Sequence, residues 1–190
     1  MGNNINIQLE NFEGGQQRSH LYRYYFARGF VEPEDVVVDY GNGYGYGSFL
    51  IAKKAKKVIG IDRDDNAVRY ATEHYKTDNC YFMQGNIDQM DQFPLCDVIV
   101  CVECFEHLRY PEAFASKAMA SARKKIVVTC PIVPTKHEDP THLNDFTQSQ
   151  VAEMFNTEKW TSLDSSLQGI YMLAVFVKKK LIKRNIVRLM

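Results

Sequence analysis

The chain has 190 residues, 45% of them hydrophobic and 24% charged, and its 23 basic and 23 acidic side chains give a formal net charge of zero. This length predicts one domain with a substantial core, and the neutral balance disfavours nucleic acid as a partner because no overall field attracts a polyanion. We expect no membrane span and no secretion signal, because no apolar run is long enough for the first and the amino terminus lacks the charged-then-apolar pattern of the second.

The chain begins with a polar segment that leads into a helical pattern. Residues 1–17 are rich in Asn, Gln and Gly, and we expect a flexible amino-terminal arm. Residues 18–30 carry apolar side chains at helical spacing and predict a first helix. Four of its side chains can fold over a bound ligand as a lid: Arg18, His20, Arg23 and Tyr24. Packing of an amphipathic helix on the sheet explains Tyr24 equally well.

A glycine-rich turn between two apolar runs is the most informative part of the sequence. The run over 36–40 enters the turn at 41–47, a helix of about 48–56 follows, and a second run over 57–62 ends in Asp62. Glycines allow the backbone to approach a ligand where a Cβ atom would collide. This order is that of the nucleotide-binding half of an open parallel sheet, in which the ligand lies at the carboxyl ends of the strands.

The residues around this turn indicate which kind of nucleotide ligand binds there. Asp62 lies 23 residues after Asp39, and an acid about 20 residues past such a turn holds ribose hydroxyls. A dinucleotide fingerprint, G-x-G-x-x-G, needs a small third residue that packs helix on strand, but Tyr46 or Ser48 stands there. The spacing therefore disfavours an NAD- or flavin-dependent dehydrogenase.

The rest of the chain continues the alternation and ends in a hairpin. We expect helices over about 65–75, 111–122 and 147–156, and strands over about 80–84, 97–103 and 125–130. A long loop with three prolines spans 131–146. Two last strands, 160–167 and 170–177, pair near Gly169 as a hairpin, which makes one strand near the edge antiparallel. Residues 178–190 form a basic tail that either contacts phosphates or is solvated.

Asp39-x-Gly41-x-Gly43-x-Gly45 resembles the first motif of the class I S-adenosylmethionine-dependent methyltransferases. Four later segments resemble later motifs of that family in the same order: 79–87, 96–108 with its E-x-x-E-H-L pattern, 125–131 and 142–147. The resemblance covers residues 18–177 and implies a single methyltransferase domain. It also implies an α/β fold with a Rossmann-like doubly wound sheet of seven strands, mostly parallel with one antiparallel strand near the edge, and helices on both faces.

The same resemblance implies S-adenosylmethionine as the cofactor. The family's cofactor-binding positions correspond to Asp39, Gly41, Gly43, Gly45, Asp62, Arg63, Asn86, Ile87, Val102 and Glu103. Asp62 is expected on the ribose, Asn86 and Ile87 on the adenine, and Asp39 at the amino end of the cofactor. Arg63 either packs over the adenine or faces solvent. Asn86 departs from the family's usual Asp, and its side chain can still bond an adenine amino group.

Methyl transfer from a sulfonium is an in-line displacement that requires neither a metal nor a covalent intermediate, and we expect neither. Positioning can supply up to about 7–11 kcal/mol, and a general base adds about 10²–10⁴-fold only when the nucleophile starts protonated. The candidate bases are His107, His137 and His142. Each has an alternative role, because His107 can cap backbone at a helix start and the two loop histidines can be solvated. Cys101-x-x-Cys104 lacks the second cysteine pair of a zinc site.

The sequence favours a cytoplasmic enzyme that methylates oxygen or nitrogen of a small molecule, such as a sugar or glycan precursor. Its five cysteines are an odd number and lie mostly in strand-like runs, which indicates free thiols and a reducing compartment. An RNA or protein methyltransferase is the nearest alternative, although only the basic tail offers a surface for nucleic acid. A non-catalytic S-adenosylmethionine-binding partner subunit is the other alternative.

Overall fold

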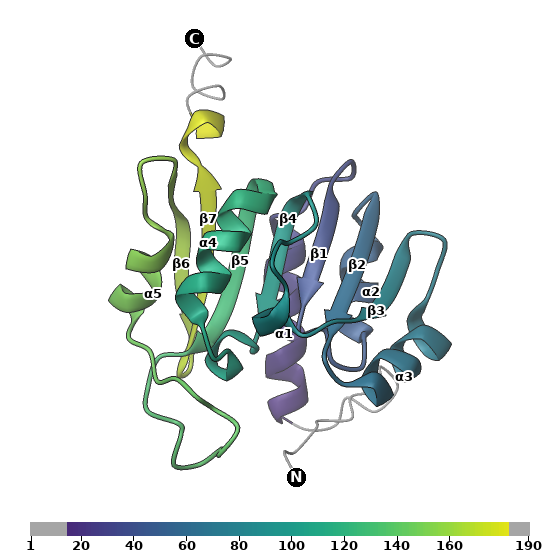
Figure 1. Cartoon of the computed structure of the whole chain (residues 1–190), viewed down its shortest axis with the longest axis horizontal. Coiled ribbons are helices and arrows are strands. Elements are labelled where there is room, and N and C mark those ends of the chain that lie inside the picture. Colours follow the sequence, from purple (N-terminus) through teal and green to yellow (C-terminus); the bar gives the residue numbers. More distant parts are fainter. Residues whose placement is uncertain (1–14, 183–190) are drawn as a thin grey trace.

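One seven-stranded sheet forms the centre of the molecule, and helices lie on both of its faces (Figure 1). The computed structural model describes residues 15–182. The strands are β1 (Val36–Tyr40), β2 (Lys57–Asp62), β3 (Cys80–Gln84), β4 (Cys96–Val102), β5 (Ala122–Pro131), β6 (Trp160–Gln168) and β7 (Tyr171–Lys178). The helices are α1 (Gly15–Gly29), α2 (Tyr46–Ala52), α3 (Asp65–Tyr75), α4 (Pro111–Ser121) and α5 (Gln148–Phe155), with two short 3-10 turns, η1 (Ile87–Gln89) and η2 (Phe105–His107).

The strand order places a change of winding direction next to β1. The order is β3-β2-β1-β4-β5-β7-β6, and β1 to β5 are parallel to one another. β7 is antiparallel to both β5 and β6, so the predicted fold class is confirmed. The chain moves outward from β1 through β2 and β3 and then returns to β4 on the other side of β1. Such a reversal opens a crevice at the carboxyl ends of β1 and β4.

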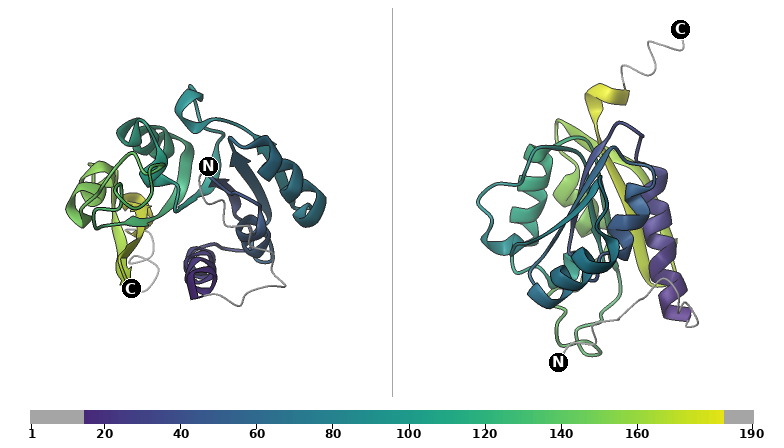
Figure 2. Two further views of the ribbon diagram at one scale, coloured as in Figure 1. Left: turned by 90° about the horizontal axis from the view of Figure 1, so that it is seen from below. Right: turned by 90° about the vertical axis from the view of Figure 1, so that its right-hand side faces the viewer.

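Alternate side chains of the central strands pack against opposite layers of helices. Figure 2 shows these helix layers on the two faces of the sheet from two directions. Val37 and Val98 belong to the cluster that includes Tyr24 of α1 and residues of α2. Their neighbours Val38 and Ile99 belong to the cluster formed with α4 and α5. A strand that is buried on both faces requires apolar side chains at both parities. The apolar runs of β1 and β4 satisfy this requirement.

The observed helix boundaries differ from the predicted ones around the glycine turn. α2 spans Tyr46–Ala52 and not 48–56, because Gly45 takes a φ of 89° at its N-cap and so starts the helix earlier. α1 begins at Gly15, so the last three residues of the predicted arm are helical. In residues 15–182, no helix combines the length and the hydrophobicity that a bilayer crossing demands.

The remaining predicted boundaries agree closely with the structure. Thr147 caps α5, because its hydroxyl accepts from Gln150 N and the Gln150 side chain accepts from Thr147 N. β5 is longer than predicted at both ends, because Ala122 pairs with Cys96 of β4 and Pro131 pairs with Tyr171 of β7. The predicted arm before Gly15 and the predicted tail beyond residue 182 lie outside the described residues.

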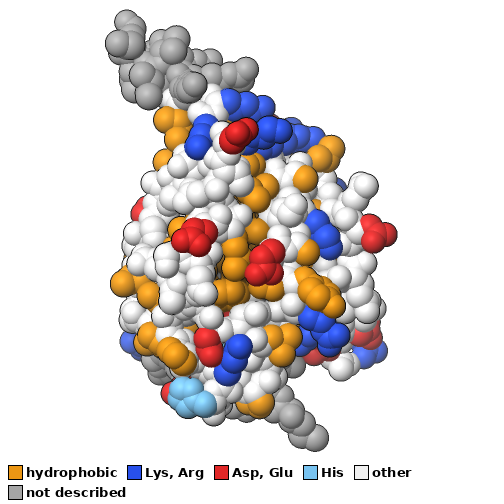
Figure 3. Space-filling view, turned by 60° about the vertical axis from the view of Figure 1, so that its left-hand side comes forward, with side chains coloured by type: hydrophobic (Ala, Val, Ile, Leu, Met, Phe, Trp, Pro, Cys, Tyr) orange, Lys and Arg blue, Asp and Glu red, His pale blue; other side chains and the backbone are white. Residues whose placement is uncertain are grey.

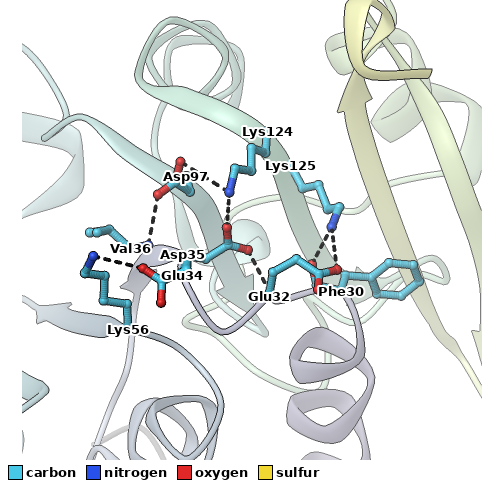
Figure 4. Close-up of polar contacts among 9 residues, drawn as sticks. All are labelled: Phe30, Glu32, Glu34, Asp35, Val36, Lys56, Asp97, Lys124 and Lys125. Atoms are coloured by element: carbon cyan, nitrogen blue, oxygen red, sulfur yellow. Dashed lines mark hydrogen bonds and ion pairs between the residues drawn. The ribbon is translucent and has the colours of Figure 1, made fainter. Parts of the chain in front are cut away.

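Ion pairs close the amino edge of the sheet (Figure 4). Asp35 is fully buried, accepts a hydrogen bond from Glu32 N at 2.8 Å and forms an ion pair with Lys124. Lys124 Nζ also lies 3.7 Å from Asp97 Oδ1, and Asp97 Oδ2 accepts from Val36 N at 3.0 Å. These contacts connect the start of β1 to β4 and β5. The network therefore holds in place the strands whose other ends form the crevice.

Lys and Arg side chains gather at one end of the face that carries β6 and β7, as Figure 3 shows. Burial lowers the pKa of Lys178, and the nearby charges of Lys180, Lys159 and Arg123 lower it further. Lys178 ends β7, which is antiparallel to β5. This positive patch therefore lies at the amino edge of the parallel strands, away from the crevice.

The buried ion pair of Asp35 predicts that substitution of this residue lowers stability much more than substitution of the neighbouring Glu34. Asp35→Asn should lower the free energy of unfolding by about 1–3 kcal/mol, because it removes a buried charge-assisted partner of Lys124. Glu34→Gln is the matched control, since its pair with Lys56 is exposed and such pairs contribute about 0–1 kcal/mol. Urea denaturation of both variants measures the difference, and equal losses would contradict the assigned role of Asp35.

Candidate functional site

A cavity of about 990 Å³ lies at the carboxyl edge of the sheet. Its walls come from the segments that follow β1, β2, β3, β4 and β5, from α1, and from the turn between β6 and β7. This is the position that the change of winding direction prescribes for a ligand, and the volume is at the upper end of the range for small-molecule sites. Segments from the whole length of the domain therefore meet in one place.

The three glycines of the predicted motif occupy positions that favour glycine for different structural reasons. Gly41 has a φ of 72°, and a Cβ atom there would overlap the Cys104 side chain. Gly43 has a φ of 51° and faces open space, and both residues line the cavity. A Cβ atom on Gly45 would overlap Ala71 of α3. Gly45 therefore packs two helices together and caps α2, while Gly41 and Gly43 form the wall against which a ligand can rest.

Asp62 organises the floor of the cavity. Its Oδ2 accepts from Gly43 N at 2.8 Å and its Oδ1 accepts from Asp64 N at 2.9 Å. The carboxylate thereby holds the glycine turn against the start of α3. Each carboxylate oxygen has two lone pairs, so each retains one acceptor position for a ligand. Arg63, the next residue, also lines the cavity.

Asn86 and Ile87 line the cavity beyond β3, as predicted for an adenine pocket. Asn86 Oδ1 accepts from Asp88 N at 3.1 Å and caps η1, which leaves its amide nitrogen as a donor. Asp88 in turn accepts from Arg109 N at 3.1 Å. This contact connects η1 to the segment before α4 and closes the cavity on that side.

Asp39 lies beneath the glycine turn and is fully buried. Ser48 Oγ donates to its Oδ2 at 2.6 Å. Burial raises the pKa of Asp39 to about 7, although hydrogen bonds from Ser48 and Tyr24 oppose the shift. Asp39 is absent from the described cavity lining, so its charge acts on the cavity from behind the turn.

Helix α1 forms one wall of the cavity through two polar side chains. Arg23 forms an ion pair with Glu103, and its guanidinium lies 3.6 Å from the centre of the Tyr171 ring. His20 hydrogen-bonds Tyr46 through Nδ1, and burial, with Arg23 second, lowers the pKa of His20. The predicted lid is therefore a fixed wall made by His20, Arg23 and Tyr24, and the exposed Arg18 takes no part in it.

Glu103 has the strained backbone of the site. It is the one non-glycine residue with a positive φ, 47°, among the described residues, and such outliers gather at functional sites. Burial raises the pKa of Glu103 to about 7, against the lowering effect of Arg23. Glu103 and Val102 both line the cavity, as predicted for this position after β4.

The predicted catalytic histidines separate into a pair and a single residue. The rings of His107 and His142 lie 4.7 Å apart, centre to centre, and both line the cavity. His107 Nδ1 donates to Thr141 O at 3.0 Å, and His142 Nδ1 lies 2.7 Å from Thr135 Oγ1. His137 has a side chain that is 69% exposed, lies 3.5 Å from Glu138 and is outside the described cavity lining.

The turn from Gln168 to Tyr171 lines the cavity and was not predicted. Its place depends on the pairing of β7 with β5, which sets Tyr171 beside Pro131. No local pattern in the sequence marks this turn as part of a site. Tyr44 and Tyr46 also line the cavity, and the three tyrosines of the glycine turn are an unusual sequence feature that draws attention to them.

The cavity is acidic. Its described lining contains seven acidic side chains, Asp62, Asp64, Asp88, Glu103, Glu106, Glu138 and Asp139, and two guanidinium groups, on Arg23 and Arg63. Burial raises the pKa of Glu103 to about 7 and that of Glu106 to about 8, so the other five carry most of the negative charge at neutral pH. Such a lining attracts cations and repels polyanions. A positively charged sulfonium or amine suits this environment, whereas a phosphate backbone does not.

The sequence profile of a family described as "Methyltransferase domain" matches residues 32–171. An uncharacterised protein of Methanocaldococcus jannaschii is 34% identical over 73 residues, which are 37% of this chain. That match spans only 28% of the relative's own length.

Solved structures share the fold at low sequence identity. One chain of the complex between the Haloferax volcanii Trm112 methyltransferase activator and a methyltransferase is 15% identical, with a TM-score of 0.74 and coverage of 86% of this chain and 92% of that chain. Magnesium protoporphyrin IX methyltransferase from Synechocystis, with bound S-adenosylhomocysteine, is 15% identical, with a TM-score of 0.71 and coverage of 86% and 85%. The same Synechocystis enzyme with bound S-adenosylmethionine gives a TM-score of 0.70 at 16% identity, with coverage of 86% and 82%.

The raised pKa of Asp39 predicts a pH-dependent effect of one substitution. Its folded-state pKa is about 7, against 3.8 in the unfolded chain, so the folded state holds a proton that the unfolded chain releases between about pH 4 and pH 7. The contribution of Asp39 to the unfolding free energy therefore falls as pH rises through this window, by up to about 1.4 kcal/mol per pH unit.

Asp39→Asn should accordingly gain stability relative to the wild type as pH rises. Urea denaturation of both proteins across this range measures the change, and the exposed Asp91→Asn is the control. A stability difference that stays constant with pH would contradict the burial effect.

Proposed function

Because the chain belongs to the methyltransferase-domain family, we propose that it transfers the methyl group of S-adenosylmethionine to an oxygen or nitrogen of a small molecule. Membership of the family makes the chain an S-adenosylmethionine-dependent methyltransferase, and the acceptor is the proposed part. A sugar or glycan precursor is the first acceptor class to examine. We further propose a cytoplasmic location, which the five free cysteines support.

The cofactor is proposed to occupy the half of the cavity next to β1, β2 and β3. Asp62 offers one free acceptor position on each carboxylate oxygen, which suits the two ribose hydroxyls. The amide of Asn86 and the side chain of Ile87 then face the adenine. Gly43, which faces open space, leaves room for the methionine portion, and the acidic lining stabilises the sulfonium.

The acceptor is proposed to occupy the other half, next to β4 and β5. This half is bounded by Glu106, His107 and His142 and by the turn before β7. Both halves belong to one cavity of about 990 Å³, and this is the observation that carries the proposal. A shared cavity can hold nucleophile, methyl group and sulfur in line, and such positioning can supply up to about 7–11 kcal/mol.

A nucleic-acid acceptor is disfavoured by the distribution of charge. The cavity carries seven acidic and two basic side chains among its described lining residues, and a phosphate backbone would be repelled there. The positive patch around Lys178 lies at the opposite edge of the sheet. A small molecule without a phosphate backbone can enter the cavity without this charge repulsion.

The release of S-adenosylhomocysteine tests the proposed acceptor class. The protein should bind S-adenosylmethionine and S-adenosylhomocysteine in calorimetry with dissociation constants near 1 μM, about −8 kcal/mol, and should not bind NAD. Turnover should appear with one class in a panel of sugars, phenols and amines. Turnover only with RNA or with a protein would overturn the small-molecule acceptor, and binding of the cofactor without any turnover would indicate a partner subunit.

The role of Asp62 predicts a large loss of cofactor affinity. Asp62→Ala removes two charge-assisted hydrogen bonds of about 1.5–3 kcal/mol each, so the dissociation constant for S-adenosylmethionine should rise at least tenfold. Asp91→Ala is the control, because Asp91 is exposed and outside the described lining. Calorimetry measures both constants, and thermal melting checks that the variant is folded. An unchanged constant would remove Asp62 from the ribose site.

The division of the cavity predicts that His142 acts on the acceptor alone. His142→Ala should leave the dissociation constant for S-adenosylmethionine within about twofold and lower turnover by at least tenfold, because a base or positioning group contributes about 10²–10⁴-fold. Calorimetry and initial rates with the identified acceptor separate the two effects. Full turnover in this variant would show that His142 takes no part in transfer.

A further inference from the structure

Two histidines and a buried glutamate meet at the acceptor half of the cavity. Glu106, His107 and His142 each offer one ligand atom, and these atoms lie within 4.8 Å of one another. Glu106 and His107 belong to η2 after β4, whereas His142 lies 35 residues further along the chain, in the loop after β5. A coordination site for a cation needs ligand atoms that converge in this way.

Backbone hydrogen bonds hold the two segments together. Leu143 N and Asn144 N donate to Glu106 O at 2.9 and 3.1 Å, and Asn144 Nδ2 donates to Leu108 O at 2.6 Å. The cluster is therefore fixed by hydrogen bonds to main-chain carbonyls on both sides of Glu106 and His107. Side chains on such a frame are positioned before any ligand arrives.

Each histidine has one ring nitrogen engaged, which determines the nitrogen that remains for a ligand. His107 Nδ1 donates to Thr141 O at 3.0 Å, and this bond leaves the Nε2 lone pair free. A backbone carbonyl is a usual second partner of a metal-binding histidine. His142 Nδ1 lies 2.7 Å from Thr135 Oγ1. Its Nε2 lies 3.7 Å from Asp139 Oδ2, which is a further oxygen near the cluster.

The buried side chain of Glu106 is a second feature, separate from the convergence of the three ligand atoms, that indicates a cation site. The residue is only 1% exposed, and in the described part of the chain its Oε2 has no hydrogen-bond partner. A buried carboxyl oxygen without a partner costs free energy, and such a group in a native structure needs an explanation, of which a bound ion is one. The unpaired carboxylate belongs to the same three-residue cluster and also lines the cavity.

We propose that Glu106, His107 and His142 bind a divalent transition-metal cation at the acceptor half of the cavity. One carboxylate and two imidazoles are a ligand set for Zn²⁺ and Fe²⁺, and Zn²⁺ is sufficient because methyl transfer involves no redox change. Three protein ligands leave coordination positions open toward the cavity. The cysteines are not needed for this site.

The cation also narrows the class of acceptor, and this part rests on the proposed function. An acceptor hydroxyl bound to the open position has a lowered pKa and loses its proton to solvent. Its oxygen then forms a bond to the methyl carbon while the bond from that carbon to sulfur breaks, and S-adenosylhomocysteine leaves. The acceptor is therefore a small molecule with an oxygen that binds a metal, such as a phenol or a vicinal diol.

Metal titration of the full chain tests the site without any acceptor. After removal of metals with a chelator, Zn²⁺ should bind with one equivalent in calorimetry. Co²⁺ should give a visible absorption spectrum without a thiolate charge-transfer band, because the ligands contain no sulfur. Glu106→Gln and His142→Ala should each weaken Zn²⁺ binding at least tenfold. His74→Ala is the control, since His74 stacks on Tyr70 on an exposed helix face, and it should bind Zn²⁺ like the wild type.

Several outcomes would overturn the proposal. Binding of less than one equivalent of Zn²⁺, equal affinity in Glu106→Gln and the wild type, or a thiolate band with Co²⁺ would each remove the site. Glu106→Gln is nearly isosteric, and retained binding of S-adenosylmethionine would show that this variant is folded. Full turnover of the metal-free enzyme would overturn the role of the cation in acceptor binding. Failure to bind S-adenosylmethionine would instead count against the proposed function and leave the metal titration interpretable.

Discussion

The close approach of the glycine turn to the end of β4 is the constraint on which the site depends. β1 and β4 are neighbours, and the chain leaves β1 at Gly41 directly against the Cys104 side chain. Both exits turn through positive φ, 72° at Gly41 and 47° at Glu103. Two turns that bend apart at adjacent strand ends leave a crevice between them. A Cβ atom on Gly41 would overlap the Cys104 side chain and force these two turns apart, so their close approach requires glycine at that position.

Charged side chains have different roles at the two edges of the sheet. At the amino edge, Asp35 and Asp97 share Lys124, and the ion pairs connect strands. At the carboxyl edge, burial raises the pKa of Asp39 and Glu106, to about 7 and about 8 respectively, and no lysine lines the described cavity. Buried acids of this kind reduce stability, and proteins retain them where a ligand benefits from them. The fold thus places its stabilising charges and its ligand-directed charges at opposite ends of the same strands.

The two halves of the cavity depend on contacts of different sequence separation. The cofactor half consists of short segments that follow consecutive strands, and the hydrogen bond that holds its glycine turn, from Gly43 N to Asp62 Oδ2, stays within one βαβ unit. The acceptor half depends on contacts between distant segments, as when Leu143 N donates to Glu106 O. A local unit keeps its geometry when the rest of the domain changes, whereas the acceptor half can be reshaped by the loop after β5. This difference explains how one fold can bind the same methyl donor in different proteins while the methyl acceptor changes.

The sequence by itself determined the order of the elements, the glycine turn and the acid after β2, because hydrophobic periodicity and turn chemistry are local properties. It also pointed to Asn86, Ile87 and Glu103, which line the cavity as expected. Only the tertiary structure decided which histidines meet. His137 and His142 are five residues apart in one loop, yet His142 faces His107 whereas His137 is exposed. The path of that loop depends on the bond from Thr135 N to Asp145 and on the bonds to Glu106 O. The turn before β7 reaches the cavity through strand pairing alone. Such long-range contacts leave no periodic trace in the sequence, because they depend on where two separate segments meet in space.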